Sequence, residues 1–456
     1  MKKIFDFMGT FSDFMWGIPI AGLIAAVAII ITFYTKGFQF RYFGKIIKNT
    51  LGNLKDKGSG ETGTSPWRAA CTSIANTIGT GNIVGVAVAI GVGGPGAVFW
   101  MWMVALFGMI IKYAEVVLAV RYRNPDSVTG NYVSGMNIIA KNGLGKKWHW
   151  LAHAFAFSCM ISMCVGLGIH TNGFTDAITS AFEVSPVIIG IVIVIITALL
   201  AFGGWKRISG FCELCVPVMT IIYIAAGILV LAFHITAIPG SLGLIFKSAF
   251  TGQAAVGGFA GATLFAAFSN GMARGVYSSA AGQGLSPFTH ANADTEHPAK
   301  QGIWAITEVF IDTIIVCTFT ALVILCTGEW KTGDAGSALV TAAFSSGLGI
   351  SHELSAIFVA VILLLFGFSS MITDVYNGET TLAAYFNTKT SRVIFKLIAL
   401  VFCYFGCVGG LENAYVLNDF FMAWMCLFTV LIILLCRKEL IKLTNEYVDK
   451  YIQKRK

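Results

Sequence analysis

Charged side chains are scarce in this sequence, and their scarcity limits the kinds of protein it can encode. Asp, Glu, Lys and Arg make up only 12% of the chain, against about 25% in soluble proteins. Hydrophobic residues make up 56%, and the mean hydropathy is +0.76. No polar block of domain size separates the apolar segments, each of which reaches the roughly 20 residues that cross a bilayer. The sequence therefore predicts one polytopic membrane domain.

Motifs of the common enzyme and pump classes are also missing. The eleven cysteines lie almost entirely in apolar segments without a paired framework, so we interpret them as packing residues. No Walker sequence is present, and the run Gly79-x-Gly81-x-x-x-Gly85 lacks the dinucleotide-binding spacing. His149 and His153 have the spacing of a zinc helix but no following Glu. We expect no enzyme activity and no organic cofactor.

The basic residues describe a membrane topology. Lys and Arg gather in every second loop, and such loops face the cytoplasm. The net charge of +8 therefore reflects topology, and we expect no nucleic-acid partner. An odd helix count places the N-terminus outside and the C-terminus in the cytoplasm, in a multi-pass protein of the plasma (inner) membrane. About eleven transmembrane helices are predicted, at 16–34, 69–92, 96–120, 150–172, 186–203, 209–233, 256–281, 302–327, 354–385, 394–410 and 415–436.

Two of these helices contain polar, glycine-rich interruptions at mid-membrane depth. One is Ala75–Gly85 in the second helix, and the other is Phe268–Gly275 in the seventh. They lie five helices apart, which is the spacing expected for the two discontinuous helices of an inverted five-plus-five repeat. We predict an all-α fold with one N-terminal helix plus this repeat. Its parts are an N-terminal helix and basic cytoplasmic linker (1–65), a ten-helix transport core (66–436, with repeats at about 66–235 and 250–436) and a basic cytoplasmic tail (437–456).

An unwound turn in a membrane exposes backbone groups that hydrocarbon cannot satisfy, so it must face protein, water or a ligand. Half-helix N-termini suit a substrate carboxylate, and freed carbonyls suit a hard cation such as sodium. The alternative for one such segment is a close helix crossing through small residues four apart, here Gly81 and Gly85. Two segments at matching repeat positions favour the binding-site interpretation.

Specific stretches point to a family. The segments Gly79–Ala87, Gly93–Trp102, His297–Gly302 and Glu308–Thr313 resemble the alanine or glycine:cation symporter family. The likeness runs from about residue 66 to about residue 410. Members of that family look like the leucine-transporter fold with one helix added at the N-terminus. The resemblance implies a secondary active symporter that couples uptake of an alanine- or glycine-like amino acid to a sodium gradient by alternating access.

The resemblance also implies cation sites. The first interrupted helix is similar to the matching stretch of neurotransmitter:sodium symporters, so the backbone carbonyls of Ala75 and Ile78 are expected to bind sodium. The hydroxyls of Ser369 and Ser370 would complete that cage, because a hard cation prefers oxygen ligands. Asn82 is expected to join the substrate to a second cation.

For the amino acid, the resemblance implies that the amides of Thr80, Gly81 and Asn82 hold the carboxylate. Carbonyls near Phe265, Phe268 and Ser269 would face the amine. The remaining expected substrate-binding residues are Asn76, His170, Ser370 and Asp374, and Arg274 is expected to act in a cytoplasmic gate.

Three positions depart from the family pattern. His170 stands where the family has Gln, Asp374 stands where a pocket Trp is typical, and Tyr277–Gly282 replaces Phe-Ser-Asn-Glu-Ala-Gly. A Trp-to-Asp change enlarges the site, and His adds a titratable partner. A larger, more polar or cationic amino acid is therefore one hypothesis. The alternative is that His170 and Asp374 pair with each other and merely fill space.

The predicted partners are an amino acid, sodium and the lipid bilayer, and a monomer is expected. Two alternative functions stay open at this point. An ion channel also uses broken helices with exposed carbonyls, and a proton-coupled transporter of another small solute would share the fold.

Overall fold

The computed structural model describes residues 2–56, 63–251, 264–409 and 413–453. Within these ranges the fold is almost entirely helical, as predicted. The β-structure of the described residues is a single antiparallel pair of short strands, β1 (Asn124–Pro125) and β2 (Tyr132–Val133).

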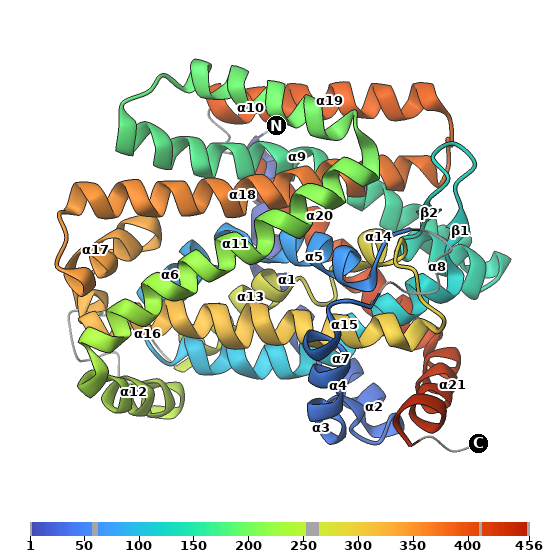
Figure 1. The fold of residues 1–456 in the computed structure, drawn as a ribbon, viewed down its shortest axis with the longest axis horizontal. Helices are drawn as coiled ribbons and strands as arrows, with labels where there is room; N and C mark the ends of the chain where they lie inside the picture. The colour runs from blue at the N-terminus through green and yellow to red at the C-terminus, as the bar shows by residue number, and fades with distance from the viewer. Residues whose placement is uncertain (1, 57–62, 252–263, 410–412, 454–456) are drawn as a thin grey trace.

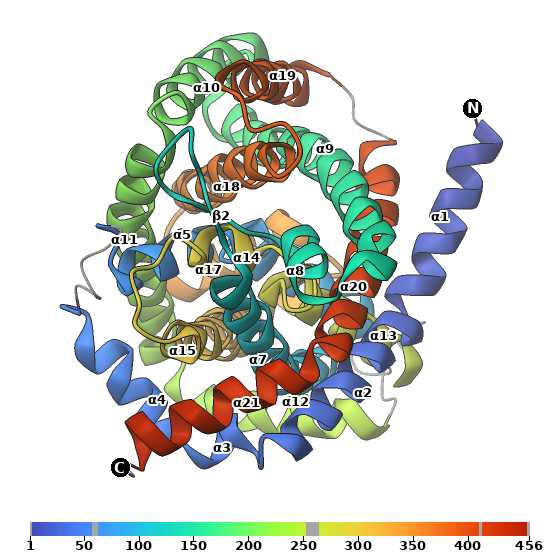
Figure 2. The same cartoon turned by 90° about the vertical axis from the view of Figure 1, so that its right-hand side faces the viewer.

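A helical N-terminal segment precedes the core. The first apolar span begins earlier than predicted, because α1 (Lys2–Trp16) and α2 (Ile18–Tyr34) together form one candidate span, Lys3–Tyr34. Figure 2 shows α1 at the edge of the molecule, and it packs against α20. Two short helices follow on the way to the core, α3 (Phe38–Arg41) and α4 (Phe43–Asn49).

Each predicted span coincides with a helix. Eight described helices are long and apolar enough to cross a membrane, and a bent pair makes a ninth. The sixteen-residue α10 is shorter, and the predicted start of the seventh span at 256 lies outside the described residues. The helices of the core are α5 (Pro66–Thr77), α6 (Val84–Gly93), α7 (Ala97–Tyr122), α9 (His149–Phe182), α10 (Pro186–Ala201), α11 (Gly204–Phe233), α13 (Leu264–Ser279), α15 (Pro298–Val309), α16 (Cys317–Thr327), α18 (His352–Ala383), α19 (Lys389–Val408) and α20 (Ala414–Leu435).

Shorter helices connect these spans or follow them. They are α8 (Met136–Gly143), α12 (Ile238–Thr251), α14 (Ser286–His290), α17 (Gly336–Leu348) and α21 (Arg437–Tyr447). A π-helical turn, Phe310–Val316, joins α15 to α16, and a second one, Val448–Ile452, follows α21. Single 3-10 turns occur at Leu51–Asn53, Thr80–Asn82, Lys146–Trp148, Ile235–Ala237 and Glu329–Lys331.

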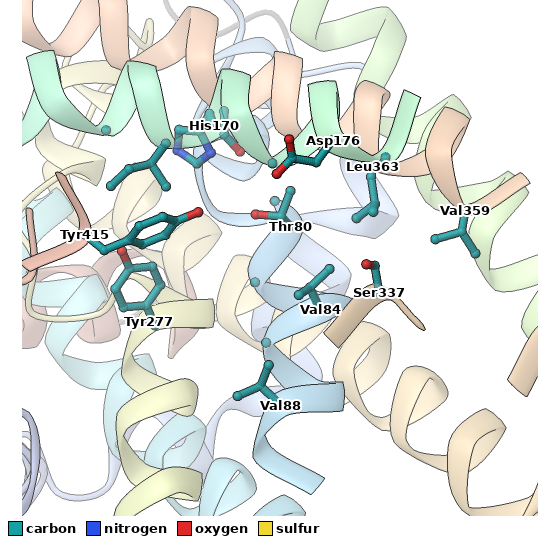
Figure 3. Close-up of a pocket in the computed structure, with 18 of the residues that line it drawn as sticks. Thr80, Val84, Val88, His170, Asp176, Tyr277, Ser337, Val359, Leu363 and Tyr415 are labelled. Carbon is teal, nitrogen blue, oxygen red and sulfur yellow. The ribbon is translucent and has the colours of Figure 1, made fainter. Parts of the chain in front are cut away.

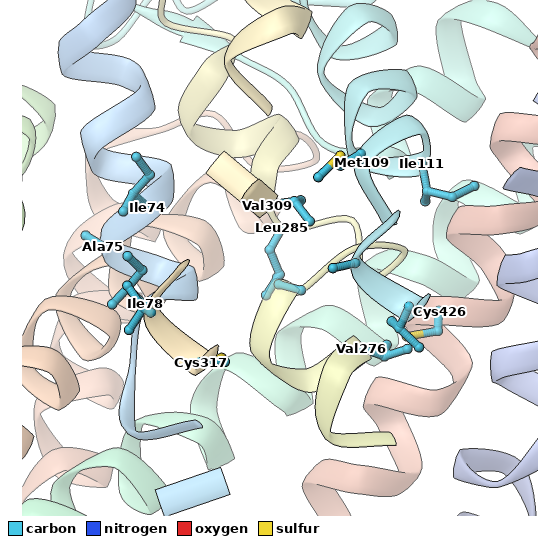
Figure 4. Packing of buried hydrophobic residues seen from close by; sticks show 14 of the residues in the cluster. Ile74, Ala75, Ile78, Met109, Ile111, Val276, Leu285, Val309, Cys317 and Cys426 are labelled. Atoms are coloured by element: carbon cyan, nitrogen blue, oxygen red, sulfur yellow. The ribbon is translucent and has the colours of Figure 1, made fainter. Parts of the chain in front are cut away.

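The spans form two groups around a central pair. Figure 1 shows α9, α10, α18 and α19 stacked on one side and α7 and α15 on the other, with α5 and α6 between them. On α10, Ile188, Val192, Ile195 and Leu199 are exposed at spacings of three and four residues. A large apolar face of this kind is suited to a bilayer rather than to water. The interior is closely packed, and Figure 4 shows part of it between α5 and α7.

The first predicted break is confirmed. Ser65 caps α5 by accepting a hydrogen bond from the Arg68 amide, and Pro66 occupies the first turn. The helix ends at Thr77, and α6 starts at Val84 with a bend of 63°. An added Cβ at Gly81 or Gly85 would meet nothing within 4 Å, so these glycines do not mediate a close helix crossing.

The second predicted break is misplaced. Residues 268–275 lie inside the continuous helix α13, and the chain unwinds at 280–285 instead, before α14. Ala280, Gly282 and Gly284 there have φ of 49°, 87° and 76°. Gly271 and Gly275 explain the error, because they are the small residues four apart that let α13 approach α7. A Cβ at Gly275 would lie 3.1 Å from the Met101 Cα, and one at Gly271 would clash with the Ala97 carbonyl.

Candidate functional site

A cavity of about 1460 Å³ lies between the two groups of helices. It runs from the breaks to the end of the bundle where α9 ends and α18 begins, since Phe182, Glu183, His352 and Glu353 also line it. Figure 3 shows His170, Tyr277 and Tyr415 near one another and Thr80 across from them, with apolar side chains such as Val88 and Leu363 further along. The predicted site residues that line the cavity are Asn76, Thr80, Gly81, His170, Arg274, Ser370 and Asp374.

A group of oxygen atoms lies beside the break that ends α5. The Ser370 hydroxyl is 3.0 Å from the Ala75 carbonyl oxygen, and the Ser369 hydroxyl is 3.4 Å from it. Both hydroxyls also lie within 3.1 Å of the Phe366 carbonyl oxygen, and both serines are fully buried. Ile78, fully buried too, is the first residue after α5. Neutral oxygens from two helices are the ligand set that a hard cation prefers.

A second polar cluster joins the two breaks. Asn82 is fully buried, and its side-chain oxygen accepts the Gly79 amide at 3.2 Å. Its amide nitrogen donates to the Asp312 carboxylate and to the Ser278 hydroxyl. Ser278 lies in the last turn of α13, and Asp312 lies in the π-helical turn. Asn82 is therefore buried beside the cavity rather than among the residues that line it.

Ser278 and Asp312 are absent from the predicted site. Asp312 had a sequence signal, since a carboxylate in an apolar span is costly unless it is paired or functional. The π-helical turn that presents it has no recognisable pattern in the sequence, although such turns often occur at functional sites.

Two charged residues of α7 hold the second break. The Lys112 ammonium donates to the Ser279 carbonyl at 2.8 Å, at the end of α13 where the helix dipole is negative. Glu115, one turn further along α7, accepts the Gly282 amide at 2.7 Å. The backbone groups exposed by unwinding therefore have partners from a neighbouring helix, as the membrane requires.

Glu308 of α15 collects hydrogen bonds from three other elements. Its carboxylate lies 2.9 Å from the Lys112 ammonium and 3.2 Å from the His290 Nε2, and all three side chains are completely buried. Ser73 and Thr77 of α5 donate to the same carboxylate at 2.9 and 3.1 Å. This network connects α5, α7, α14 and α15.

His170 and Asp374 meet in the cavity wall. The His170 Nε2 lies 3.4 Å from one Asp374 oxygen, and the Asn76 amide donates to the other at 2.8 Å. The two departures from the family pattern are therefore in contact, and both line the cavity. A second polar chain, which the sequence did not reveal, lies nearby: Ser162 donates to Asn418 at 2.8 Å, and Asn418 donates to the Tyr277 hydroxyl at 3.1 Å.

The expected amine-binding set is wrong. Phe265, Phe268 and Ser269 belong to the outer turns of α13 and are not among the lining residues, because the break lies after Ser279. Phe265 is 59% exposed, and the Phe268 ring packs on Trp100. The unwound turn after α13, with Ala280 and Gln283, lines the cavity instead.

The predicted location of Arg274 is wrong for the same reason. It precedes the break, so it lies on the side of the cavity that opens near Glu353, away from the basic loops. There it is within electrostatic range of Asp419 on α20. A role in a cytoplasmic gate does not fit that place.

Ion pairs cluster instead at the basic end of the bundle. Arg68 of α5 is 2.6 Å from Glu213 of α11. Arg392 of α19 lies 2.6 Å from Asp126 and 3.1 Å from Glu379. Burial alone would raise the pKa of Asp126, but hydrogen bonds from Thr129, Val128 and Asn387 and the Arg392 charge bring it below its usual value. These contacts tie α5 to α11, and α19 to α18 and the β1–β2 hairpin, at the end opposite the cavity mouth.

Comparison with known proteins supplies the family. The whole chain, residues 1–456, matches the family model described as the sodium:alanine symporter family. The chain is 35% identical over 422 residues to the sodium/alanine symporter AgcS of Methanococcus maripaludis, with 90% of each protein covered. It is 32% identical over 452 residues to the probable sodium/glutamine symporter GlnT of Bacillus subtilis, with 98% of this chain and 91% of that protein covered.

Among solved structures, the fold is similar to that of MhsT in complex with L-phenylalanine. The TM-score is 0.52 at 14% identity, over 82% of this chain and 89% of that one. At this identity the likeness shows the fold alone, which is the predicted leucine-transporter-like fold.

Proposed function

This chain belongs to the sodium:alanine symporter family, and on that premise we propose that it takes up an alanine- or glycine-like amino acid with sodium by alternating access. Membership makes it a multi-pass membrane transporter that couples an amino acid to a cation, with sodium as the coupling ion, and not an enzyme. The names of its relatives, a sodium/alanine symporter and a probable sodium/glutamine symporter, support a neutral amino acid as the solute.

The observation that carries the proposal is the meeting of Ser369 and Ser370 with the Ala75 carbonyl at the α5 break. These oxygens are buried, uncharged and drawn from two different helices, α5 and α18. Sodium bound among them would hold α5 against α18, so the ion would favour one arrangement of the bundle over another. Coupling of this kind requires an ion site that contains a moving helix.

The amino acid would bind where the two breaks face the cavity. The amides of Thr80 and Gly81 lie just before α6, whose N-terminus favours a carboxylate. The carbonyls that end α13 would accept the ammonium group, apart from those of Val276 and Ser279, to which Gln283 and Lys112 already donate. Asn82 touches both breaks and would connect the solute to a second cation.

The unequal ends of the bundle support the proposal of alternating access. The cavity mouth lies near Glu183, at the end of α9, and Glu353, at the start of α18, on the side that the charge pattern assigns to the outside. At the other end the Arg68–Glu213 pair holds α5 against α11. Opening to the cytoplasm would break this pair while the outer part of the cavity closes. In this orientation the N-terminus would lie outside and the C-terminus in the cytoplasm.

Uptake by proteoliposomes tests the proposal. Purified protein is reconstituted, and uptake of labelled alanine and glycine is measured under an inward sodium gradient, an inward proton gradient, or neither. The proposal expects accumulation only with the sodium gradient. Accumulation driven by protons alone would identify a proton-coupled carrier. Sodium current without any solute would identify a channel. Either result would contradict the proposal.

A further inference from the structure

A small space opens in the cavity wall at Gly166 of α9. An added Cβ at this glycine would lie 3.5 Å from the Asp374 Oδ2 and 3.8 Å from the Asn418 Oδ1. Among the described residues it would meet no other heavy atom within 4 Å outside its own stretch of helix. All three residues line the cavity. A carbon atom therefore fits between the two oxygens at ordinary contact distances, and we call this space the Gly166 notch.

The carboxylate on one side of the notch has an oxygen that is open to the cavity. Asp374 is only 4% exposed, and its Oδ1 accepts a hydrogen bond from the Asn76 amide at 2.8 Å. Its Oδ2 faces the His170 Nε2 at 3.4 Å but accepts no hydrogen bond from the residues that the structure describes. This Oδ2 is not among the fully buried atoms that lack a partner, and 6% of the Asp374 side chain remains accessible. A carboxylate oxygen in so dry a place is unfavourable without a donor, and a donor that enters the notch would satisfy it.

The oxygen on the other side is also an acceptor, because its amide group is held in one orientation. The Asn418 nitrogen donates to the Tyr277 hydroxyl at 3.1 Å, and the Asn418 Oδ1 accepts from Ser162 at 2.8 Å. This Oδ1 keeps a second lone pair. The notch is therefore flanked by one acceptor from α18 and one from α20.

We infer that the Gly166 notch is a specificity subsite of the transporter and that it selects small α-amino acids with a side-chain hydroxyl group, as in serine and threonine. The inference rests on the proposed function. The hydroxyl donates its hydrogen to the Asp374 Oδ2, which is a charged acceptor, and its oxygen lies beside Asn418. Asp374 and Tyr277, which orients Asn418, both stand where this chain departs from the family pattern. The subsite thus depends on residues that the family pattern lacks.

Other side chains fit this subsite less well. The methyl group of alanine donates no hydrogen bond, and glycine leaves the notch empty. A carboxylate side chain faces two acceptors, and a carboxamide brings its own carbonyl oxygen toward them. An ammonium group carries three hydrogens, whereas the notch presents two oxygen atoms.

Ligand-induced thermal stabilisation of the full-length protein in detergent tests this preference. L-Serine is compared in sodium chloride with L-2-aminobutyrate, which has a methyl group in place of the hydroxyl, so the two ligands differ only in the group that reaches Asp374. L-Alanine, L-asparagine and L-2,3-diaminopropionate represent the short apolar, carboxamide and cationic side chains. We expect the dissociation constant of serine to be at least about tenfold lower than that of 2-aminobutyrate, because 2-aminobutyrate lacks the hydrogen bond to a charged group.

Variants locate the preference. Gly166→Ala should reduce the ratio of 2-aminobutyrate to serine dissociation constants to nearly one, because the added methyl group fills the notch without displacing either oxygen. Asp374→Asn should lower this ratio, since the acceptor loses its charge. Gly173→Ala is the matched control and should keep the ratio: Gly173 lines the same cavity on the same helix, and its added Cβ would meet none of the described residues within 4 Å. The melting temperature of each variant without ligand verifies that it is folded.

The outcomes separate the two proposals. If no amino acid stabilises the protein in sodium, the proposed function fails and the inference fails with it. If alanine stabilises the protein but 2-aminobutyrate binds as tightly as serine, the inference is wrong while the proposed function stands. Tightest binding of asparagine or diaminopropionate would also overturn the inference, and so would a serine preference that survives Gly166→Ala.

Discussion

The buried charge pair of Lys112 and Glu308 makes a strong prediction about stability. Both side chains are completely excluded from solvent, and the ammonium lies 2.9 Å from the carboxylate. Replacing Glu308 with Gln keeps the shape of the side chain but removes its charge. Lys112 would then be a buried cation that keeps its hydrogen bond to the neutral Ser279 carbonyl and has only the more distant Glu115 and Asp312 in electrostatic range.

The magnitude follows from this burial. Breaking one partner of a fully buried pair typically costs about 3–5 kcal/mol, because the other charge is left uncompensated. Glu308→Gln also weakens the hydrogen bonds from Ser73, Thr77 and His290, which all reach the same carboxylate. We therefore expect a loss near the upper end of that range.

A double-mutant cycle measures this loss of stability. Glu308→Gln, Lys112→Met and the double variant are purified, and their unfolding is followed by heat and by denaturant. Each single variant should be much less stable than the parent, and the double variant should recover most of the loss, because neutral replacements of a buried pair are often tolerated. Glu439→Gln is the matched control: its pair with Arg121 is partly exposed, so its loss should cost less than about 1 kcal/mol.

Two results would refute this reasoning. Glu308→Gln could cost no more than the control, which would mean that the charge of Lys112 is neutralised in some other way. Alternatively, the double variant could be as unstable as the worse single variant. The carboxylate would then matter for its hydrogen bonds to α5 and not for its charge.

Three further predictions concern the ion site and one helix cap. Ser370→Ala should raise the sodium concentration for half-maximal uptake by about 10- to 150-fold, the effect of losing one contact to a charged group. The control Ser355→Ala should leave this concentration unchanged, because Ser355 is a buried serine of the same helix that donates to a distant carbonyl. Gly79→Ala should raise the same sodium concentration by a smaller factor, since the added Cβ would lie 2.7 Å from the Ser370 hydroxyl while the backbone there (φ −124°) accepts alanine. An unaltered sodium dependence of uptake would count against the site. Burial, together with Lys450, lowers the pKa of His297 although Glu446 opposes the shift, and the neutral ring caps α15 by accepting the Ala299 amide. A depressed histidine pKa stabilises the fold above the unfolded value, so the melting temperature should fall as pH drops below about 6.5, and by less in His297→Asn, which caps without titrating.

Much of the fold could be predicted because the bilayer imposes simple rules. Hydropathy located the eight long apolar helices and the bent pair that the structure describes. The first break was recognisable because α6 and its preceding turn combine glycine with polar residues where lipid would demand Leu or Val. The second break was misplaced because Gly271 and Gly275 produce a similar pattern for a different reason, which is close packing against α7. A single sequence does not separate these two uses of glycine.

Only part of the site could be predicted, because many residues that contact one another there lie far apart along the chain. Ala75, Ser369 and Ser370 were found through a resemblance that covers their motifs. The partners of the intramembrane charges were not, because Glu308 contacts Lys112 across 196 positions and Ser73 across 235. Asp312 depends in addition on a π-helical turn, which a helical repeat of 3.6 residues does not suggest.

Asn76 stands directly after Ala75, and this adjacency has a thermodynamic consequence. Ala75 contributes its carbonyl to the group of oxygens beside Ser370, and Asn76 contributes its side chain to the cavity wall at Asp374. Under the proposed function, occupation of either place would bias the same short turn, so the two affinities would be linked, and linkage is reciprocal. The factor by which sodium tightens amino-acid binding must equal the factor by which the amino acid tightens sodium binding. Two independent titrations can therefore measure how strongly this single turn of helix couples its two ligands.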